Sequence, residues 1–176
     1  DPFSGESIWT SAPLGERDGY SVDGSPLAAK TAVVVPTRER RGLHLHAFDR
    51  ATGKKLWSSP DPVAPVGTSW LAIDDLLVGN TPTGELLAIE APTGVLRYRH
   101  VLGGVIEADV PRRLEPVLRS GALFVPHSDV HVIRPADGTH LATIAPCEAI
   151  PDLLRVDERC DVYVAEESGH LVSFSA

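Results

Sequence analysis

The chain repeats itself along its length, at offsets of 41 and then 44 residues. Residues 47–57, Ala-Phe-Asp-Arg-Ala-Thr-Gly-Lys-Lys-Leu-Trp, align without a gap with residues 88–98, and residues 132–142 form a third copy that keeps the turn glycine. A fourth copy begins at residues 173–175, and residues 1–9 repeat residues 49–57 with Asp, Gly and Trp in register. A fixed period of about 20 to 50 residues indicates a solenoid or a propeller. We interpret the chain as four repeats in circularly permuted order.

Each repeat divides into four short strands, because apolar stretches alternate with tight polar joints such as Asp74-Asp75 and Ser120-Gly121. The Thr-Gly turn joins the third strand to the fourth, where glycine takes a positive φ without steric cost. The sequence predicts an all-β fold, a β-propeller with four blades of four antiparallel strands each. The expected blades cover residues 25–60, 69–102, 115–146 and 152–176, and residues 5–12 are the expected fourth strand of the last blade.

Residues 47–57 match the pattern Ala-x-Asp-x-x-Thr-Gly-x-x-x-Trp at every defined position. This is the tryptophan-docking motif of PQQ-like, or quinoprotein-like, β-propeller repeat proteins, and the whole chain resembles that family in degenerate form. In the family the tryptophan of one blade packs against the Thr-Gly turn of its neighbour. The resemblance therefore implies structural roles for three aromatic residues and four turn glycines, namely Trp9, Trp57, Tyr98, Gly5, Gly53, Gly94 and Gly138.

The permuted order leaves two ways to complete the ring. Residues 5–12 can close a small ring of four blades by adding the missing strand to the last blade, which would remove exposed sheet edges. Alternatively, residues 1–176 form half of a larger propeller, since members of the family more often have seven or eight blades. We favour the half-propeller because the chain contains no Met and both of its ends fall within a repeat. That pattern is expected of a mature or excised piece.

The enzymes of this family bind PQQ with an adjacent cysteine pair and a tryptophan, and bind calcium with carboxylate and amide ligands. This chain has no adjacent cysteines, and its only asparagine, Asn80, has no Asp-rich loop around it. Neither a Gly-x-Ser-x-Gly elbow nor a phosphate-binding glycine loop is present. We therefore expect a protein that is not an enzyme and that binds neither PQQ nor calcium.

Two histidine pairs, His44 with His46 and His127 with His131, raise the question of a metal site. No third ligand is near the first pair, and the spacing of the second suits a helix rather than the expected hairpin. We interpret all four as solvated or core-edge histidines. The two cysteines, Cys147 and Cys160, fall at opposite ends of one expected strand, whereas bridged Cα atoms lie within about 7 Å. Bridged and free thiols both remain open.

Charge excludes a general nucleic-acid binder, because 16 Lys and Arg stand against 24 Asp and Glu, a formal net charge of −8. No apolar run approaches the roughly 20 residues of a membrane-spanning helix, and the N-terminus shows no basic and apolar leader. We expect a soluble domain.

Blade topology places two sets of loops on one face, which we call the loop face: those joining the fourth strand to the next blade and those joining the second strand to the third. Long irregular loops carry function more often than tight turns. Arginine forks suit carboxylate or phosphate partners, although a solvated charged rim is the alternative. The candidate partner-binding residues on these loops are Arg17, Tyr20, Arg38, Arg40, Arg41, Arg112, Arg113 and His127.

The family includes a lipoprotein of the outer-membrane protein assembly machinery that docks its partner on propeller loops. The resemblance thus implies a non-catalytic scaffold of the bacterial cell envelope, in the periplasm, that binds a protein partner or the remaining blades of a larger propeller. Two other functions stay open. They are a ligand-sensing ectodomain of a signalling protein and a fragment of a PQQ-dependent dehydrogenase.

Overall fold

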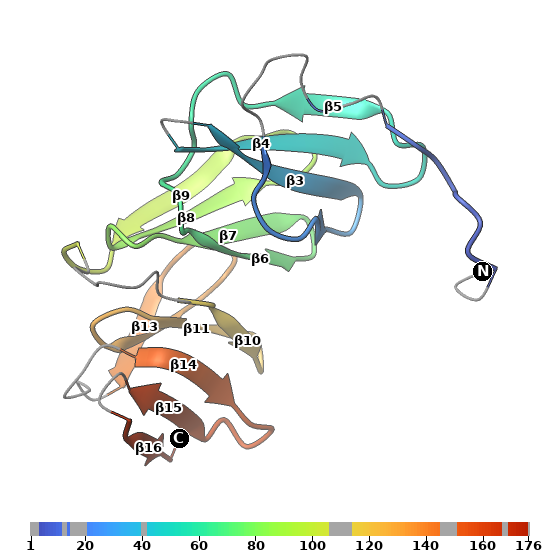
Figure 1. Ribbon diagram of the computed structural model, residues 1–176. Coiled ribbons are helices and arrows are strands. Elements are labelled where there is room, and N and C mark those ends of the chain that lie inside the picture. The colour runs from blue at the N-terminus through green and yellow to red at the C-terminus, as the bar shows by residue number, and fades with distance from the viewer. Residues whose placement is uncertain are drawn as a thin grey trace.

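The computed structural model describes residues 4–11, 14, 21–39, 42–105, 114–144, 151–166 and 169–175. Within them the fold is all β, and four antiparallel sheets, each built from one consecutive segment, follow one another along the chain (Figure 1). The sheets cover residues 21–58, 69–101, 117–144 and 151–174, where the sequence predicts blades over 25–60, 69–102, 115–146 and 152–176. In the described part of the chain no helix is long and apolar enough to cross a membrane.

The strands of the first two blades alternate with short turns. The first blade contains β1 (Ser21–Val22), β2 (Leu27–Ala28), β3 (Ala32–Glu39), β4 (Gly42–Asp49) and β5 (Lys55–Ser58). Because β1 and β2 both pair with β3, they share one strand position. The second blade contains β6 (Ser69–Ile73), β7 (Leu76–Asn80), β8 (Glu85–Glu90) and β9 (Leu96–Val101).

The last two blades follow the same order. The third contains β10 (Val117–Arg119), β11 (Ala122–Pro126), β12 (Val130–Ile133) and β13 (His140–Ile144). The fourth contains β14 (Pro151–Val156), β15 (Val162–Glu166) and β16 (Leu171–Phe174), and it is three-stranded.

The hairpin of β3 and β4 is longer than the sequence predicts. The sequence places Arg38, Arg40 and Arg41 on a loop, but β3 continues to Glu39 and β4 begins at Gly42. The extension is stabilised across the strands, where Thr37 pairs with His44 and the Thr37 hydroxyl lies 2.9 Å from Nε2 of His46. Polar side chains that find partners across a strand pair can extend a sheet beyond its apolar core.

The core lies between blades rather than inside any one of them. Strand β7 shows why, because Leu77 belongs to the apolar cluster shared with the first blade and Val78 to the cluster shared with the third. In β8, Leu87 and Leu86 divide in the same way. Successive residues of a strand point to opposite faces, so a sheet covered on both faces needs a continuous apolar run. The apolar runs of this chain are therefore the inner strands of stacked blades.

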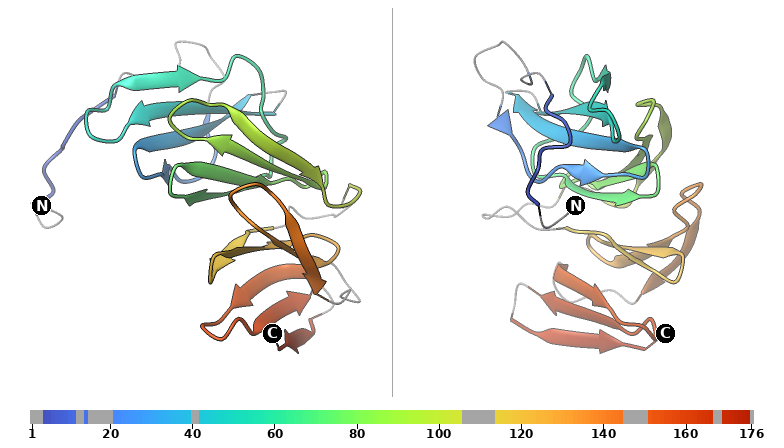
Figure 2. Two further views of the ribbon diagram at one scale, coloured as in Figure 1. Left: turned by 180° about the vertical axis from the view of Figure 1, so that it is seen from behind. Right: turned by 90° about the vertical axis from the view of Figure 1, so that its right-hand side faces the viewer.

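The four blades form an open arc (Figures 1 and 2). Residues 4–11 lie beside the first blade, where the Trp9 indole N–H donates to the Arg50 carbonyl at 3.0 Å, and β16 lies at the other end. Residues 4–11 form no strand, so the strand expected over residues 5–12 is not formed in its described part.

Candidate functional site

Most of the candidate loop residues cannot be placed. Six of them, Arg17, Tyr20, Arg40, Arg41, Arg112 and Arg113, lie outside the described residues. Arg38 is described, and it is exposed near the end of β3, paired across the strands with Ser21 and Leu43. Arg38 is thus the one predicted cation of the loop face whose position the structure gives.

His127 lies on the expected hairpin but is buried, so its side chain is not a surface contact in this structure. Its ring packs on Gly103, where an added Cβ would come within 3.0 Å of the imidazole, and its Nδ1 lies 3.1 Å from the Ser128 hydroxyl. Its Nε2 has no hydrogen-bond partner. Burial lowers the pKa of His127, and His131 lowers it further, while Asp129 acts in the opposite direction. His127 is therefore a neutral packing residue between the second and third blades.

The other histidines of the two predicted pairs are also engaged by the fold. His46 has Nδ1 at 2.8 Å from the Ser58 hydroxyl, and His44 has Nδ1 at 3.2 Å from the Ser59 carbonyl. Burial lowers the pKa of His131, whose ring meets His140 edge to face at 5.8 Å. Across the described ranges, no three His, Cys, Asp or Glu side chains are grouped to hold a metal ion.

Two tryptophans pack on the turn glycines of the following blade. The Trp57 indole covers Gly94, where a Cβ would lie 3.0 Å from Cδ2, and its N–H donates to the Ala91 carbonyl at 2.8 Å. Trp9 makes the same pair of contacts one blade earlier, with its ring on Gly53 and its N–H on the Arg50 carbonyl. In both cases the ring and its one donor are satisfied by the neighbouring turn.

At the junction between the second and third blades, a tyrosine and a histidine take the place of the tryptophan. Tyr98 packs on Gly138, and the ring of His100 lies beside it, with centroids 5.2 Å apart, in contact with the same glycine. The Tyr98 hydroxyl is buried and has no hydrogen-bond partner, and burial raises its pKa to about 12. A tyrosine cannot reproduce the indole N–H bond, so this junction relies on ring packing. The remaining motif glycine, Gly5, meets no neighbouring atom within 4 Å of an added Cβ.

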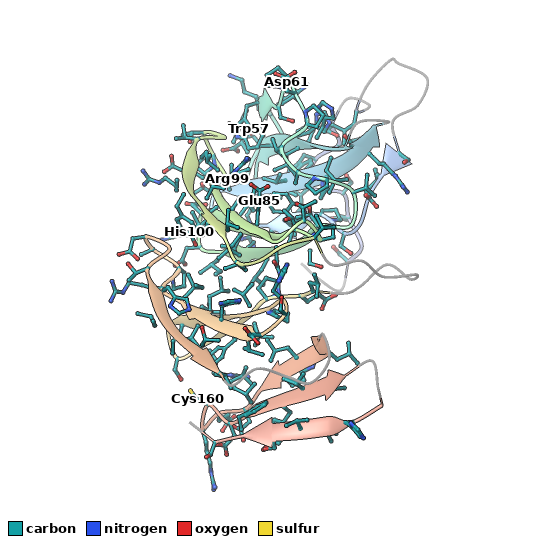
Figure 3. All side chains as sticks on the ribbon, turned by 90° about the vertical axis from the view of Figure 1, so that its left-hand side faces the viewer. Trp57, Asp61, Glu85, Arg99, His100 and Cys160 are labelled. Atoms are coloured by element: carbon teal, nitrogen blue, oxygen red, sulfur yellow. The ribbon has the colours of Figure 1, made fainter. Side chains whose placement is uncertain are left out.

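A cavity of about 400 Å³ opens between the first and second blades, and we call it the rim groove. One wall is β5 with the loop that follows it, and the other is formed by β8, β9 and the turn between them (Figure 3). Trp57, Leu87, Ile89 and Leu96 supply its apolar lining, and Asp61 and Arg99 its charged groups. Arg99 lies 3.7 Å from the Glu85 carboxylate.

A second cleft of about 510 Å³ separates the turns of the second and third blades. Its charges are largely paired. The Asp75 carboxylate accepts from Thr31, Arg97 lies 3.6 Å from Glu90, and Arg134 lies 3.2 Å from Asp137.

Asn80 is a residue whose role the sequence does not reveal. It is fully buried at the end of β7, and its amide group donates to the Leu114 carbonyl at 3.0 Å and to the Pro126 carbonyl at 2.7 Å. It thus links the second blade to the third, whereas sequence reasoning considers it only as a calcium ligand. The available signal is a single amide ending an apolar run, since a buried polar group needs partners.

The structure describes one of the two cysteines. Cys160 is a free thiol at a turn, 3.3 Å from the Ser120 hydroxyl of the preceding blade. Cys147 lies outside the described residues.

The chain is similar to known proteins in sequence pattern and in fold. A family model described as outer membrane protein assembly factor BamB matches residues 1–176. No curated protein sequence matches the chain. BamB from Moraxella catarrhalis is similar in structure, at 20% identity and a TM-score of 0.62, over 88% of this chain and 46% of that one. The computationally designed protein Ika4 is similar at 14% identity and a TM-score of 0.63, over 97% of this chain and 98% of that one. The chain spans about half the length of the BamB structure, and likeness at these identities shows the propeller fold.

Proposed function

The chain belongs to the PQQ-like propeller family described as outer membrane protein assembly factor BamB, and on this premise we propose that it is a non-catalytic scaffold of the bacterial cell envelope that binds a protein partner on its loop face. The observation that carries the proposal is the family match over residues 1–176. A propeller hosts both enzymes and scaffolds, so fold alone would not decide between them.

The contacts between adjacent blades support a scaffold function, because they fix the position of each blade relative to the next. Trp9 and Trp57 each combine ring packing with one hydrogen bond to the next blade, and we propose that they and Tyr98 dock the blades. Asn80 adds two further bonds between blades. A rigid frame lowers the ordering cost of binding, which favours recognition.

We propose that the loop face recognises carboxylates of the partner through arginines, with Arg38 as its described member and Arg17, Arg40, Arg41, Arg112 and Arg113, together with Tyr20, as the others. Guanidinium groups form paired hydrogen bonds with carboxylates, which makes them selective for acidic segments. His127 is left out of this set, because it is buried.

Site-specific photo-crosslinking in the native bacterial host tests the proposal. A photoreactive residue at Arg38 is expected to capture a protein partner, whereas the same residue at Arg134, an exposed arginine on a turn between the third and fourth strands of a blade, is not. Arg38→Glu, introduced beside a crosslinker at a neighbouring loop position, is expected to lower the yield. Equal capture from both positions, or none from Arg38, would contradict the proposal.

A further inference from the structure

The rim groove offers a binding surface between two blades, lined by Trp57, β8 and β9 together with the loop that follows β5. We propose that it binds an extended segment of a partner protein, placing an aromatic side chain over Trp57 and a lysine or arginine beside Asp61. The inference goes beyond the proposed scaffold function, because it concerns the outer rim between the first and second blades.

The neighbouring junction, between the second and third blades, shows which side chain can fill the position equivalent to the rim groove. At the repeat offset of 41, Trp57 corresponds to Tyr98 and Ser59 to His100. Between the second and third blades the His100 ring lies beside Tyr98, tilted by 34°, and contacts the turn glycine Gly138. Ser59 is too small to do the same, and its hydroxyl accepts the Leu45 amide at 3.0 Å. The His100 ring therefore fills a space between the second and third blades that remains a cavity between the first and second blades.

The size and lining of the groove suit an aromatic residue with neighbouring peptide atoms. Its volume of about 400 Å³ exceeds a single ring, and Leu87, Ile89 and Leu96 surround the Trp57 indole. Because the Trp57 N–H is already bonded to Ala91, the indole presents its apolar surface to an occupant. Aromatic pairs gain about 0.5 to 1.5 kcal/mol beyond the apolar area they bury.

The groove is also bordered by an open sheet edge. Strand β5 ends the order of the first sheet, and among the described residues no strand pairs with its outer side. Backbone groups on such an edge can bond an extended peptide as an added strand. An extended segment of a protein therefore fits this site better than a compact ligand does.

The charges at the groove indicate which kind of peptide segment binds there. Arg99 on one wall is paired with Glu85, whereas Asp61 on the other wall is exposed and no described cation pairs with it. The protein as a whole carries a formal charge of −8. A basic residue next to the aromatic one would complement both the local carboxylate and the overall field.

Peptide titration of the purified protein tests the inference without involving Arg38 or the other proposed arginines of the loop face. The probe is the blocked pentapeptide Ser-Lys-Phe-Lys-Ser, and the controls replace Phe with Ala or both Lys with Glu. The readout is the NMR shift of the Trp57 indole N–H. We expect the probe to bind at least about tenfold more tightly than either control, a difference of about 1.4 kcal/mol.

Two variants close the groove from opposite walls. Ser59→His supplies the ring that His100 gives to the neighbouring junction, and Leu96→Trp narrows the groove while leaving the Ser59 bond to Leu45 intact. Leu141→Trp is the matched control, because Leu141 is 47% exposed and Leu96 is 49% exposed, and Leu141 lies on β13, away from the groove. We expect both groove variants to weaken probe binding by about tenfold or more, and the control to leave it unchanged.

Asp61→Asn is expected to abolish the preference for the basic over the acidic peptide. The inference is overturned if the probe does not bind, or if both groove variants bind it as the parent does. Equal binding of the basic and acidic peptides to the parent would also overturn it, since the groove would then be a general apolar pocket. Because Arg38 is not among the residues that line the groove, the result of the crosslinking is independent of these outcomes.

Discussion

Single residues decide how closely adjacent blades approach. The turn glycines are the positions at which this can be tested most directly. Gly94 has a φ of +75° and faces Trp57, whereas Gly121 has a φ of +76° and would place a Cβ in open space. The two positions share the backbone requirement and differ in the neighbouring ring. Their comparison isolates the packing of Trp57 from backbone strain.

We expect Gly121→Ala to lower the free energy of unfolding by about 1 to 2 kcal/mol, the cost of a left-handed non-glycine residue. Gly94→Ala should lower it by at least about 1 kcal/mol more, because its Cβ would press on a ring packed in place. Urea unfolding of both variants and the parent measures the difference. Equal losses would show that the Trp57 contact contributes nothing to stability.

At the scale of elements, the hairpin that joins β11 to β12 contains a buried, pH-sensitive group. His127 packs under Gly103, with Ser128, Asp129 and His131 as its polar neighbours. Because burial lowers its pKa, the folded protein keeps this imidazole neutral at pH values where the unfolded chain, with a pKa of about 6.5, already binds a proton. Stability is therefore complete above that value and is lost as the pH falls below it.

We expect the free energy of unfolding to fall as the pH drops below about 6.5, and the fall to be smaller in His127→Asn, whose amide is not protonated in this range. Hydrogen bonds from Thr139, together with Arg134, lower the pKa of Asp137 to about 2, so the loss due to that group begins only below about pH 4 and does not overlap. A parental slope in His127→Asn would contradict the prediction.

At the scale of the whole molecule, the fourth blade leaves an inner strand at its edge. By its place in the repeat, β16 corresponds to β4, β8 and β12, each of which is paired on both sides, yet among the described residues β16 is paired only with β15. Such an edge is a template for an added strand.

We expect a polypeptide of residues 1–176, of 18.8 kDa, to associate through β16 as its concentration rises. Leu171→Lys should suppress the association, because a lysine on an edge strand opposes pairing. The matched control is Val101→Lys on β9, a strand that is the outermost of its blade, since Leu171 is 74% exposed and Val101 is 76% exposed. Light scattering measures the mass of all three proteins. A monomer at every concentration, or an equal effect of both substitutions, would count against this account.

The sequence alone determines the blade type, the all-β fold and the spacing of Trp9, Trp57 and Tyr98, because these depend on period-two alternation and on turns whose backbone demands glycine. Such features are local: the turn glycine recurs in all four copies of the motif, and the aromatic residue in three of them. Their partners across the junctions follow from the repeat itself.

The tertiary structure decides what differs between repeats. Whether His127 is exposed, whether a ring or a cavity stands beside the docked aromatic residue, and what Asn80 bonds to all depend on residues that meet from different blades. The open arc, with residues 4–11 beside the first blade and β16 at the far end, is likewise a matter of long-range contact. A repeat specifies the strands it shares with its neighbours, whereas packing between neighbours depends on the side chains in which they differ.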